Sequence, residues 1–348
     1  SVNMPPSGTV YPSRVVLPFL EGMLPENAEV RRRMARELDV QPDALSLLSK
    51  AGWDCPGAVQ FTLPERLEEM LRRPGLLVQV TDSDIAARLD RLRDDDASWT
   101  RPGEHWSLAG QQSKFALART EQGWAEAKGT APTTHIIKPG IGRLAYQALV
   151  EHATMRAAAT LGVNVARTTY TEFAGRPAIV VERFDRLRGS RDRVLRLHQE
   201  DLCQALGRMP ERKYEENGGP SVREMVKAFS LHAYEKSRNI SGLLDFVLIN
   251  YAAEAPDGHA KNLSIQILPS ASDIRLAPLY DLASALPYDR GGFDRDLALS
   301  IGGRRRINDI HAKLGVVPNF LRVFAHSPDA LRAFLGLHGI AEAGALDP

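Results

Sequence analysis

The chain has 348 residues, of which 43% are hydrophobic and 25% are charged, and its formal net charge is +1. This length is enough to bury a sizeable core and to form two lobes or domains. The composition is that of a globular protein, and the balanced charge gives no electrostatic footprint for nucleic acid or a membrane surface.

Membrane and secretory classes are also disfavoured. No window approaches the length of a transmembrane helix and there is no signal peptide, so we expect a cytoplasmic protein without a membrane partner. The two cysteines, Cys55 and Cys203, form neither a disulfide framework nor the spacing of a zinc site.

The first hundred residues read as a group of short helices. The pattern predicts helices over residues 27–38, 42–52, 64–72 and 82–93, the last opened by a capping cluster that begins at Thr81. The first coherent element begins only near Arg14. An acidic run, 94–96, then marks a loop before the pattern changes.

From residue 105 to 184 the chain alternates short strands around one long helix. A strand with an apolar pair ends at Lys138, and an Ala- and Leu-rich helix over 144–161 carries Glu151 near its middle. A kinase needs a strand lysine to hold the α- and β-phosphates and a helix acid to hold that lysine. Taken singly, each residue is more simply explained as a solvated surface charge.

A phosphate-covering loop should precede Lys138. Residues 107–114, Ser-Leu-Ala-Gly-Gln-Gln-Ser-Lys, join a turn to an apparent strand, and their small side chains would let backbone N–H groups approach an anion. The loop has a single glycine, Gly110, so the pattern alone is weak. Neither a Walker A sequence nor Gly-x-Gly-x-x-Gly is present, which leaves P-loop and Rossmann folds without support.

The sharpest motif is Asp257-Gly-His-Ala-Lys-Asn262, followed by Asp281. In protein kinases an Asp with an Asn five residues later, then a second Asp, forms the acidic half of the site. The first Asp orients and deprotonates the attacking hydroxyl, while the Asn and second Asp hold Mg²⁺. The alternative is a polar turn between core elements, but the order Lys, Glu, Asp, Asn, Asp favours a kinase.

Seven separated motifs resemble the HipA-type serine/threonine kinase toxins. They are, in chain order, residues 107–114 (SLAGQQSK), 132–138 (PTTHIIK), 181–186 (VERFDR), 198–204 (HQEDLCQ), 213–220 (KYEENGGP), 257–262 (DGHAKN) and 276–281 (LAPLYD). The resemblance runs from about Leu17 to the C-terminal helices. Seven motifs in register are far more specific than any one of them.

The resemblance implies an α+β, two-lobed protein-kinase-like (HipA-like) fold. It divides the chain into an N-terminal subdomain (1–100), a nucleotide-covering α/β lobe (101–188) and a mostly α-helical catalytic lobe (189–348), with a last helix near 330–339. Because relatives carry additional strands before the first element, we expect this N-terminal subdomain to be trimmed or to belong to a shorter variant.

The resemblance also implies ATP and Mg²⁺ as cofactors and a protein serine as acceptor. A HipB-like helix-turn-helix antitoxin would restrain the toxin and provide any contact with operator DNA. The substrate would be a protein such as an aminoacyl-tRNA synthetase, whose phosphorylation would cause growth arrest or persistence.

The predicted site residues follow from these motifs. The catalytic residues are Asp257, Lys138 and Glu151; the metal ligands are Asn262 and Asp281; the ATP-binding residues are Ala109, Gly110, Gln111, Lys138, Glu182, Phe184, His259, Lys261 and Tyr280. Ser107 is the predicted autophosphorylation site because relatives modify the start of this loop; the alternative is a plain turn serine.

Three of these assignments have open alternatives. In the hinge assignment, the backbone groups of Glu182 and Phe184, at the end of the strand 178–181, bind adenine. In the alternative, Phe184 is a core aromatic and residues 182 and 183 are solvated. His259 and Lys261 are read as phosphate-side or loop-ordering residues.

Two other functions are compatible with the sequence. One is a kinase acting on a small molecule or a lipid headgroup, because a fold does not fix the acceptor. The other is a nonenzymatic co-repressor that partners a helix-turn-helix protein, although the complete set of catalytic residue types argues against it.

Overall fold

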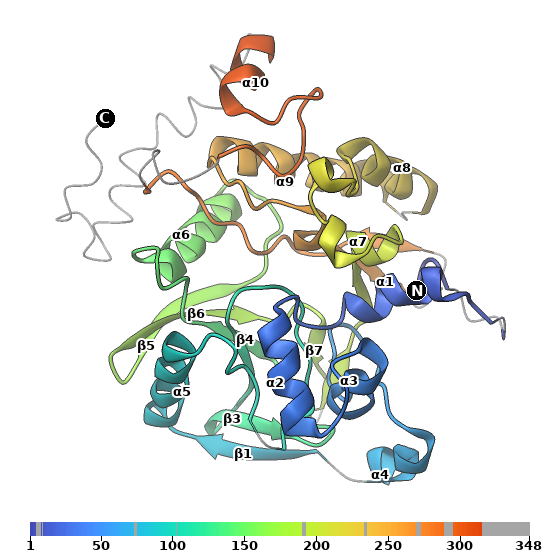
Figure 1. Cartoon of the computed structure of the whole chain (residues 1–348). Helices are drawn as coiled ribbons and strands as arrows, with labels where there is room; N and C mark the ends of the chain where they lie inside the picture. The colour runs from blue at the N-terminus through green and yellow to red at the C-terminus, as the bar shows by residue number, and fades with distance from the viewer. Residues whose placement is uncertain are drawn as a thin grey trace.

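The structure is a computed structural model that describes residues 1–4, 8, 10–72, 75–101, 103–189, 193–232, 235–268, 273–288 and 295–314. It has two lobes, with a sheet-based lobe below a helical lobe in the view of Figure 1. Helices and antiparallel strands combine as the sequence predicts, and the α+β kinase-like fold class is confirmed. The helix expected near 330–339 lies outside the described residues.

Short helices lead into the lower lobe. They are α1 (Ser13–Glu21), α2 (Ala28–Leu38), α3 (Ala44–Ala51), the 3-10 turn η1 (Pro64–Arg66) and α4 (Leu67–Arg72). Side-chain caps fix where two of them begin: Asn27 accepts from Glu29 N at the start of α2, and Asp43 accepts from Ser46 N at the start of α3. The apolar faces of α1, α2 and α3 contribute to one continuous core.

The lower lobe is built on a six-stranded antiparallel sheet. Its strands are β1 (Leu76–Val80), β2 (Phe115–Thr120), β3 (Gly123–Lys128), β4 (His135–Lys138), β5 (Thr168–Phe173) and β6 (Arg176–Glu182), in the order β1-β3-β2-β4-β6-β5. The edge strand β1 was not predicted. Its residues are mostly exposed and show no alternation, so only pairing with β3 identifies it.

Two helices cover opposite faces of this sheet (Figure 1). The helix α5 (Asp82–Asp94) opens with the predicted capping box of Thr81 and Asp84. The long helix α6 (Gln147–Thr160) lies between the sheet and the upper lobe. The side chains of β6 alternate: Ala178 and Val180 join the core that contains α5, while Ile179 and Val181 join the core that contains α6.

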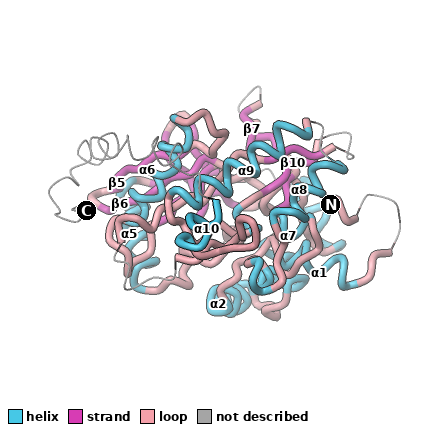
Figure 2. The backbone as a smooth tube through the Cα atoms, turned by 90° about the horizontal axis from the view of Figure 1, so that it is seen from above, coloured by secondary structure: helices cyan, strands magenta, loops and turns pink. Residues whose placement is uncertain are grey.

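The two-stranded sheet of β7 (Arg186–Arg188) and β8 (Val194–Arg196) lies beside the lower lobe (Figure 1), where Arg188 donates to Arg119 O and Arg196 to Thr130 O. The upper lobe combines helices with a small sheet. The strands of that sheet are β9 (Gln199–Asp201), β10 (Ser264–Ile267) and β11 (Ile274–Leu276), in the order β11-β10-β9. The helices and 3-10 turns of this lobe are α7 (Leu202–Ala205), η3 (Pro210–Arg212), η4 (Glu215–Asn217), α8 (Val222–His232), α9 (Lys236–Ala252), η5 (Ala260–Asn262) and α10 (Ile307–Leu314). The helix α8 packs against α9, as the view from above shows (Figure 2).

The core of the upper lobe also includes residues of the lower one. Ala148 and Met155 of α6 share this core with Phe246 of α9 and Ile265 of β10. This shared core fixes α6, and with it Glu151, against the upper lobe. No helix in the described ranges has both the length and the apolar character that spanning a bilayer requires.

Candidate active site

Lys138 ends β4 at the face where the two lobes meet. Its ammonium lies 2.8 Å from Glu151 Oε1 of α6 and also contacts Asp281, which follows β11. The side chains of Lys138 and Glu151 are each only 3% exposed. Burial alone would lower the pKa of Lys138, but the charges of Asp281 and Glu151 raise it, so this lysine stays charged.

Backbone hydrogen bonds before Asp281 hold its carboxylate next to Lys138. Leu279 donates its N–H to Asn164 O and accepts from Ala166 N, which ties the segment before Asp281 to the loop after α6. Asp281 itself has a φ of 56°, in the left-handed region. Burial alone would raise the pKa of Asp281, yet the charges of Lys138 and Lys114 hold it below the usual range. Its side chain remains 32% exposed, so a ligand can still reach this carboxylate.

The segment 257–262 connects α9 to β10. Asn262 donates from Nδ2 to the carbonyl oxygen of Asp257 at 2.8 Å, which closes the loop on itself. The side chain of Asp257 is 71% exposed and accepts a hydrogen bond from the hydroxyl of Tyr214. His259 is buried next to Asp257, with its Nε2 atom 3.7 Å from Asp257 Oδ1. Burial lowers the pKa of His259 to about 3, so its imidazole is neutral at neutral pH.

Lys261 faces away from solvent. Its ammonium lies 2.6 Å from Asp201 Oδ2, and both side chains are under 10% exposed. Tyr280 donates its hydroxyl to the carbonyl of Lys261 at 2.7 Å, and its hydroxyl lies 2.7 Å from the hydroxyl of Ser264. Of the two roles predicted for Lys261, these contacts favour ordering of the loop over contact with phosphate.

The predicted phosphate loop folds around a lysine. Lys114 is buried and donates to Ala109 O at 2.9 Å, and a Cβ on Gly110 would lie 2.8 Å from its ammonium nitrogen. Gly110 also has a φ of +98°, which favours glycine. Burial and the nearby charge of Lys138 lower the pKa of Lys114 to about 8. The loop is therefore preformed, with Gln111 between its glycine and Lys114.

Ser107, by contrast, is fully buried at the start of this loop. Its hydroxyl donates to the carbonyl of Met23, and its exposed fraction is 0%. The backbone of Glu26 donates to the carbonyl of Gly110 at 2.9 Å, which anchors the loop to the N-terminal helices.

The hinge strand β6 ends at Glu182. The N–H of Glu182 donates a hydrogen bond to Arg167 O at 2.9 Å. This corrects the prediction that this N–H could bind adenine. Of the two backbone groups of Glu182, the carbonyl remains the candidate for that contact. Phe184 stacks on Tyr280, with ring centroids 5.6 Å apart and planes at 30°. Its carbonyl accepts from Gln266 Nε2 at 3.3 Å.

Two contacts, one at the hinge and one at Asp257, were not recognised from the sequence. Arg183, read as solvated in one alternative, is 4% exposed and pairs with Asp54 and Asp185. Tyr214 appeared only as part of a motif. Tyr214 lies 43 positions before Asp257, and Arg183 lies 129 positions after Asp54. Spacing alone could therefore reveal neither contact.

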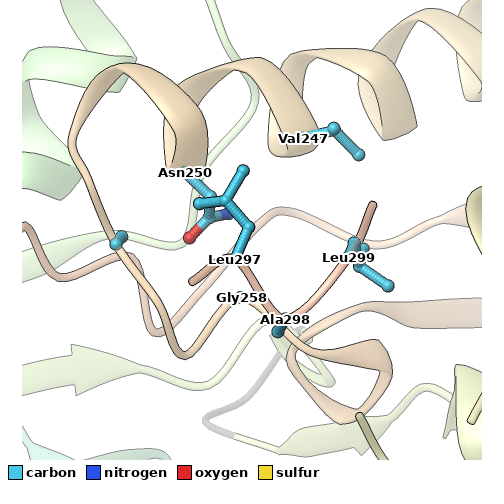
Figure 3. A pocket seen from close by; sticks show the side chains of 7 residues that line it. Val247, Asn250, Gly258, Leu297, Ala298 and Leu299 are labelled. Carbon is cyan, nitrogen blue, oxygen red and sulfur yellow. The ribbon is translucent and has the colours of Figure 1, made fainter. Parts of the chain in front are cut away.

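A small, partly open pocket borders the segment 257–262 at Gly258. It is lined by Val247, Asn250, Ala255, Gly258, Leu297, Ala298 and Leu299, with Asn250 at the end of α9 (Figure 3). Asn250 donates to Phe246 O at 2.8 Å, and its amide atoms lie 2.5–2.8 Å from where a Cβ on Gly258 would be. A side chain at position 258 would therefore displace the loop that carries Asp257.

Comparison with known proteins identifies relatives over most of the chain. A family model described as the HipA-like C-terminal domain matches residues 106–333, and one described as the HipA N-terminal domain matches residues 1–62. The protein Y4mE of Sinorhizobium fredii, named provisionally as a kinase, is 36% identical over 90% of this chain and 74% of its own. The serine/threonine-protein kinase toxin HipA of Shewanella oneidensis is 32% identical over 90% of this chain and 72% of its own.

A solved structure agrees with these relatives. The fold is similar to a chain in the complex of the Shewanella oneidensis toxin–antitoxin system HipA and HipB with its operator DNA. The TM-score is 0.75 at 28% identity, over 97% of this chain and 80% of that one.

Proposed function

The chain belongs to the HipA family, and from this premise we propose that it is an ATP-dependent serine/threonine protein kinase acting as the toxin of a toxin–antitoxin module. The observation that carries the proposal is the position of Lys138, buried between Glu151 of α6 and Asp281. A strand lysine held by a helix glutamate is the arrangement that positions nucleotide phosphates in protein kinases. Related proteins are named as kinases.

The transfer step uses Asp257 as the base. Its exposed carboxylate takes the proton of an acceptor serine hydroxyl as the hydroxyl oxygen attacks the γ-phosphorus of ATP. The bond from that phosphorus to the β–γ bridging oxygen breaks, and ADP leaves. Lys138 binds the α- and β-phosphates, and the backbone of Ala109, Gly110 and Gln111 surrounds the remaining oxygens.

Asp281 and Asn262 would hold Mg²⁺. Bound there, the ion would neutralise the negative charge that develops during phosphoryl transfer. Among the described residues, no three His, Cys, Asp or Glu side chains converge as a metal cage. One carboxylate and one amide suit Mg²⁺, which is bound through few protein ligands and completed by phosphate and water.

Adenine would lie at the hinge. The carbonyl of Glu182 at the end of β6 offers an acceptor for its exocyclic amine, and the Phe184–Tyr280 stack supplies an apolar wall. Tyr280 is held by its hydrogen bond to the carbonyl of Lys261, whose ammonium pairs with Asp201.

Ser107 would regulate the enzyme by autophosphorylation. Its burial against Met23 O means that the loop must leave before the hydroxyl can accept a phosphoryl group. A phosphate there adds roughly −1.5 to −2 charges, and the buried position cannot hold it. The modified loop would stay out, and its amides would no longer bind ATP.

The partner would be a HipB-like helix-turn-helix antitoxin, because a HipA structure with this fold is a complex with HipB and operator DNA. Contact with DNA would pass through that antitoxin, in keeping with a net charge of only +1. The protein substrate would be one whose modification stops growth, such as an aminoacyl-tRNA synthetase, and the protein would act in the cytoplasm.

Radiolabel transfer tests the activity. With Mg-[γ-³²P]ATP, the unchanged chain should label protein serine, and Asp257→Gln should lower transfer about 10²–10⁴-fold while ATP still binds. Near-full transfer by the variant would contradict the role of Asp257. Phosphoproteomics of cells producing the chain would then identify the acceptor; labelled small molecules or lipids without phosphoprotein would instead favour the small-molecule alternative.

A further inference from the structure

Tyr214 contacts the proposed base directly. Its hydroxyl lies 2.5 Å from Asp257 Oδ1. In the described part of the chain, no other side chain donates a hydrogen bond to this carboxylate, since His259 Nε2 lies 3.7 Å away. An aspartate that is 71% exposed on a loop has several rotamers available, and the phenol selects one of them.

The ring of Tyr214 is held from two sides. It meets the imidazole of His259 edge-on, with centroids 5.0 Å apart and planes at 87°. The ammonium of Lys213 lies 5.4 Å from the ring centroid and is itself bound to Glu26 at 2.8 Å, with both side chains under 10% exposed. The carbonyl of Lys213 also accepts from Ala260 N at 3.3 Å, so this loop and the one carrying Asp257 are tied together.

The backbone around Tyr214 is preorganised as well. The N–H of Gly219 donates to Tyr214 O at 2.9 Å, and a Cβ at position 219 would lie only 2.6 Å from that oxygen. Glu215 accepts from both the N–H and the hydroxyl of Ser300, at 2.6 and 2.8 Å. These contacts leave the phenol little freedom to move away from Asp257.

We propose that Tyr214 is a positioning residue for phosphoryl transfer: its hydroxyl holds Oδ1 of Asp257 so that Oδ2 is left to accept the proton of the acceptor hydroxyl. This inference rests on the proposed kinase function. Burial and the charge of Asp257 raise the pKa of Tyr214, so the phenol remains a donor throughout the neutral range. The residue acts through Asp257 and makes no bond to the transferring phosphoryl group.

Tyr214→Phe isolates this role because it keeps the ring and its contacts with His259 and Lys213 while removing one hydroxyl. A misplaced catalytic group typically costs up to about 10²-fold in rate. We expect ADP formation from saturating Mg-ATP, with water or protein as acceptor, to fall about 10–100-fold. The dissociation constant for Mg-ATP should stay within about two-fold, because the variant keeps the aromatic ring and its contact with His259.

Tyr288→Phe is the matched control. It also removes one phenol hydrogen bond in the upper lobe, to Ala145 O at 3.2 Å, and should leave the rate unchanged. Thermal unfolding of both variants should match that of the unchanged chain.

The outcomes are distinguishable. If the unchanged chain forms no ADP that depends on Asp257, the proposed function fails. If it does, but Tyr214→Phe is as fast or faster, the inference fails, and a faster rate would mean that the phenol blocks the acceptor position. A slower rate accompanied by weaker Mg-ATP binding or lower unfolding temperature would also overturn it.

Discussion

Two buried ionic clusters, one around Lys138 and one around Arg183 at the hinge, differ in how completely protein groups pair their charges. At the cleft, Lys138 is shared by two carboxylates, Glu151 and Asp281, and Asp281 is 32% exposed. Behind the hinge, the second cluster contains two aspartates and three arginines: Asp54, Asp185, Arg183, Arg186 and Arg196. We call these the cleft cluster and the hinge cluster.

The hinge cluster is closed to ligands and joins three parts of the chain. Asp54 accepts from Arg186 at 2.9 Å and from Arg196 at 3.1 Å, and the N–H of Thr133 donates to it at 2.9 Å. Asp185 is 2% exposed and accepts from Gly57 N at 2.7 Å. The charges of the hinge cluster are paired with other protein groups. The role of this cluster is therefore to hold the N-terminal segment against the hinge. In the cleft cluster, by contrast, the partly exposed carboxylate of Asp281 can still bind a cation.

The first way to test this difference is to remove one acid from each cluster. Asp54→Asn should lower the free energy of unfolding by about 3–5 kcal/mol, because it leaves Arg183, Arg186 and Arg196 with Asp185 as the one remaining carboxylate of the cluster. Urea denaturation gives this quantity directly.

Asp281→Asn serves as the matched control in the cleft cluster. Lys138 keeps Glu151 as a partner there, so the free energy of unfolding should change by less than about 1 kcal/mol. Equal losses in the two variants would mean that the clusters do not differ in the way described.

A smaller effect concerns Lys114, which lies beside the cleft cluster. Because burial and Lys138 lower its pKa to about 8 in the folded protein, the unfolded chain binds one more proton between pH 8 and the ordinary lysine value near 10.5. Stability should therefore rise with pH across this window, by on the order of 1–3 kcal/mol.

Lys114→Met provides the comparison that isolates this rise from other titrating groups. The difference between the two stability curves should be flat below pH 8 and change only above it. A difference that does not vary with pH would show that Lys114 keeps an ordinary pKa.

The sequence predicts the two clusters unequally. Lys138 and Asp281 each stand in a local motif, and a kinase-like order of residue types connects motifs that are far apart in the chain. The resemblance to HipA-type kinases is confirmed by the family matches. Arg183 and Asp185 also stand in a motif, yet nothing local indicates that Arg183 pairs with Asp54, 129 residues earlier. Long-range pairing of charges depends on the folded path of the chain, which composition and periodicity do not encode.

The same reasoning applies to the fold. Four helices of the first hundred residues, over 27–38, 42–52, 64–72 and 82–93, were predicted because caps and apolar periodicity are local signals. The helix α1 was expected only as an element that begins near Arg14. The strand β1 was missed because its pairing with β3 is nonlocal. In the upper lobe, the small sheet β11-β10-β9 interrupts a part predicted to be mostly helical. Two of its strands have only three residues each, too short to show a period.

The most direct test of the central claim, that the cleft cluster is a Mg-ATP site, is the affinity for ATP measured with Mg²⁺ and with EDTA. In the unchanged chain Mg²⁺ should strengthen binding, and Asp281→Ala should remove most of that gain because the charged ligand is lost; Asn262→Ala should have a smaller effect. An affinity that is independent of the metal and unchanged by Asp281→Ala would contradict the account.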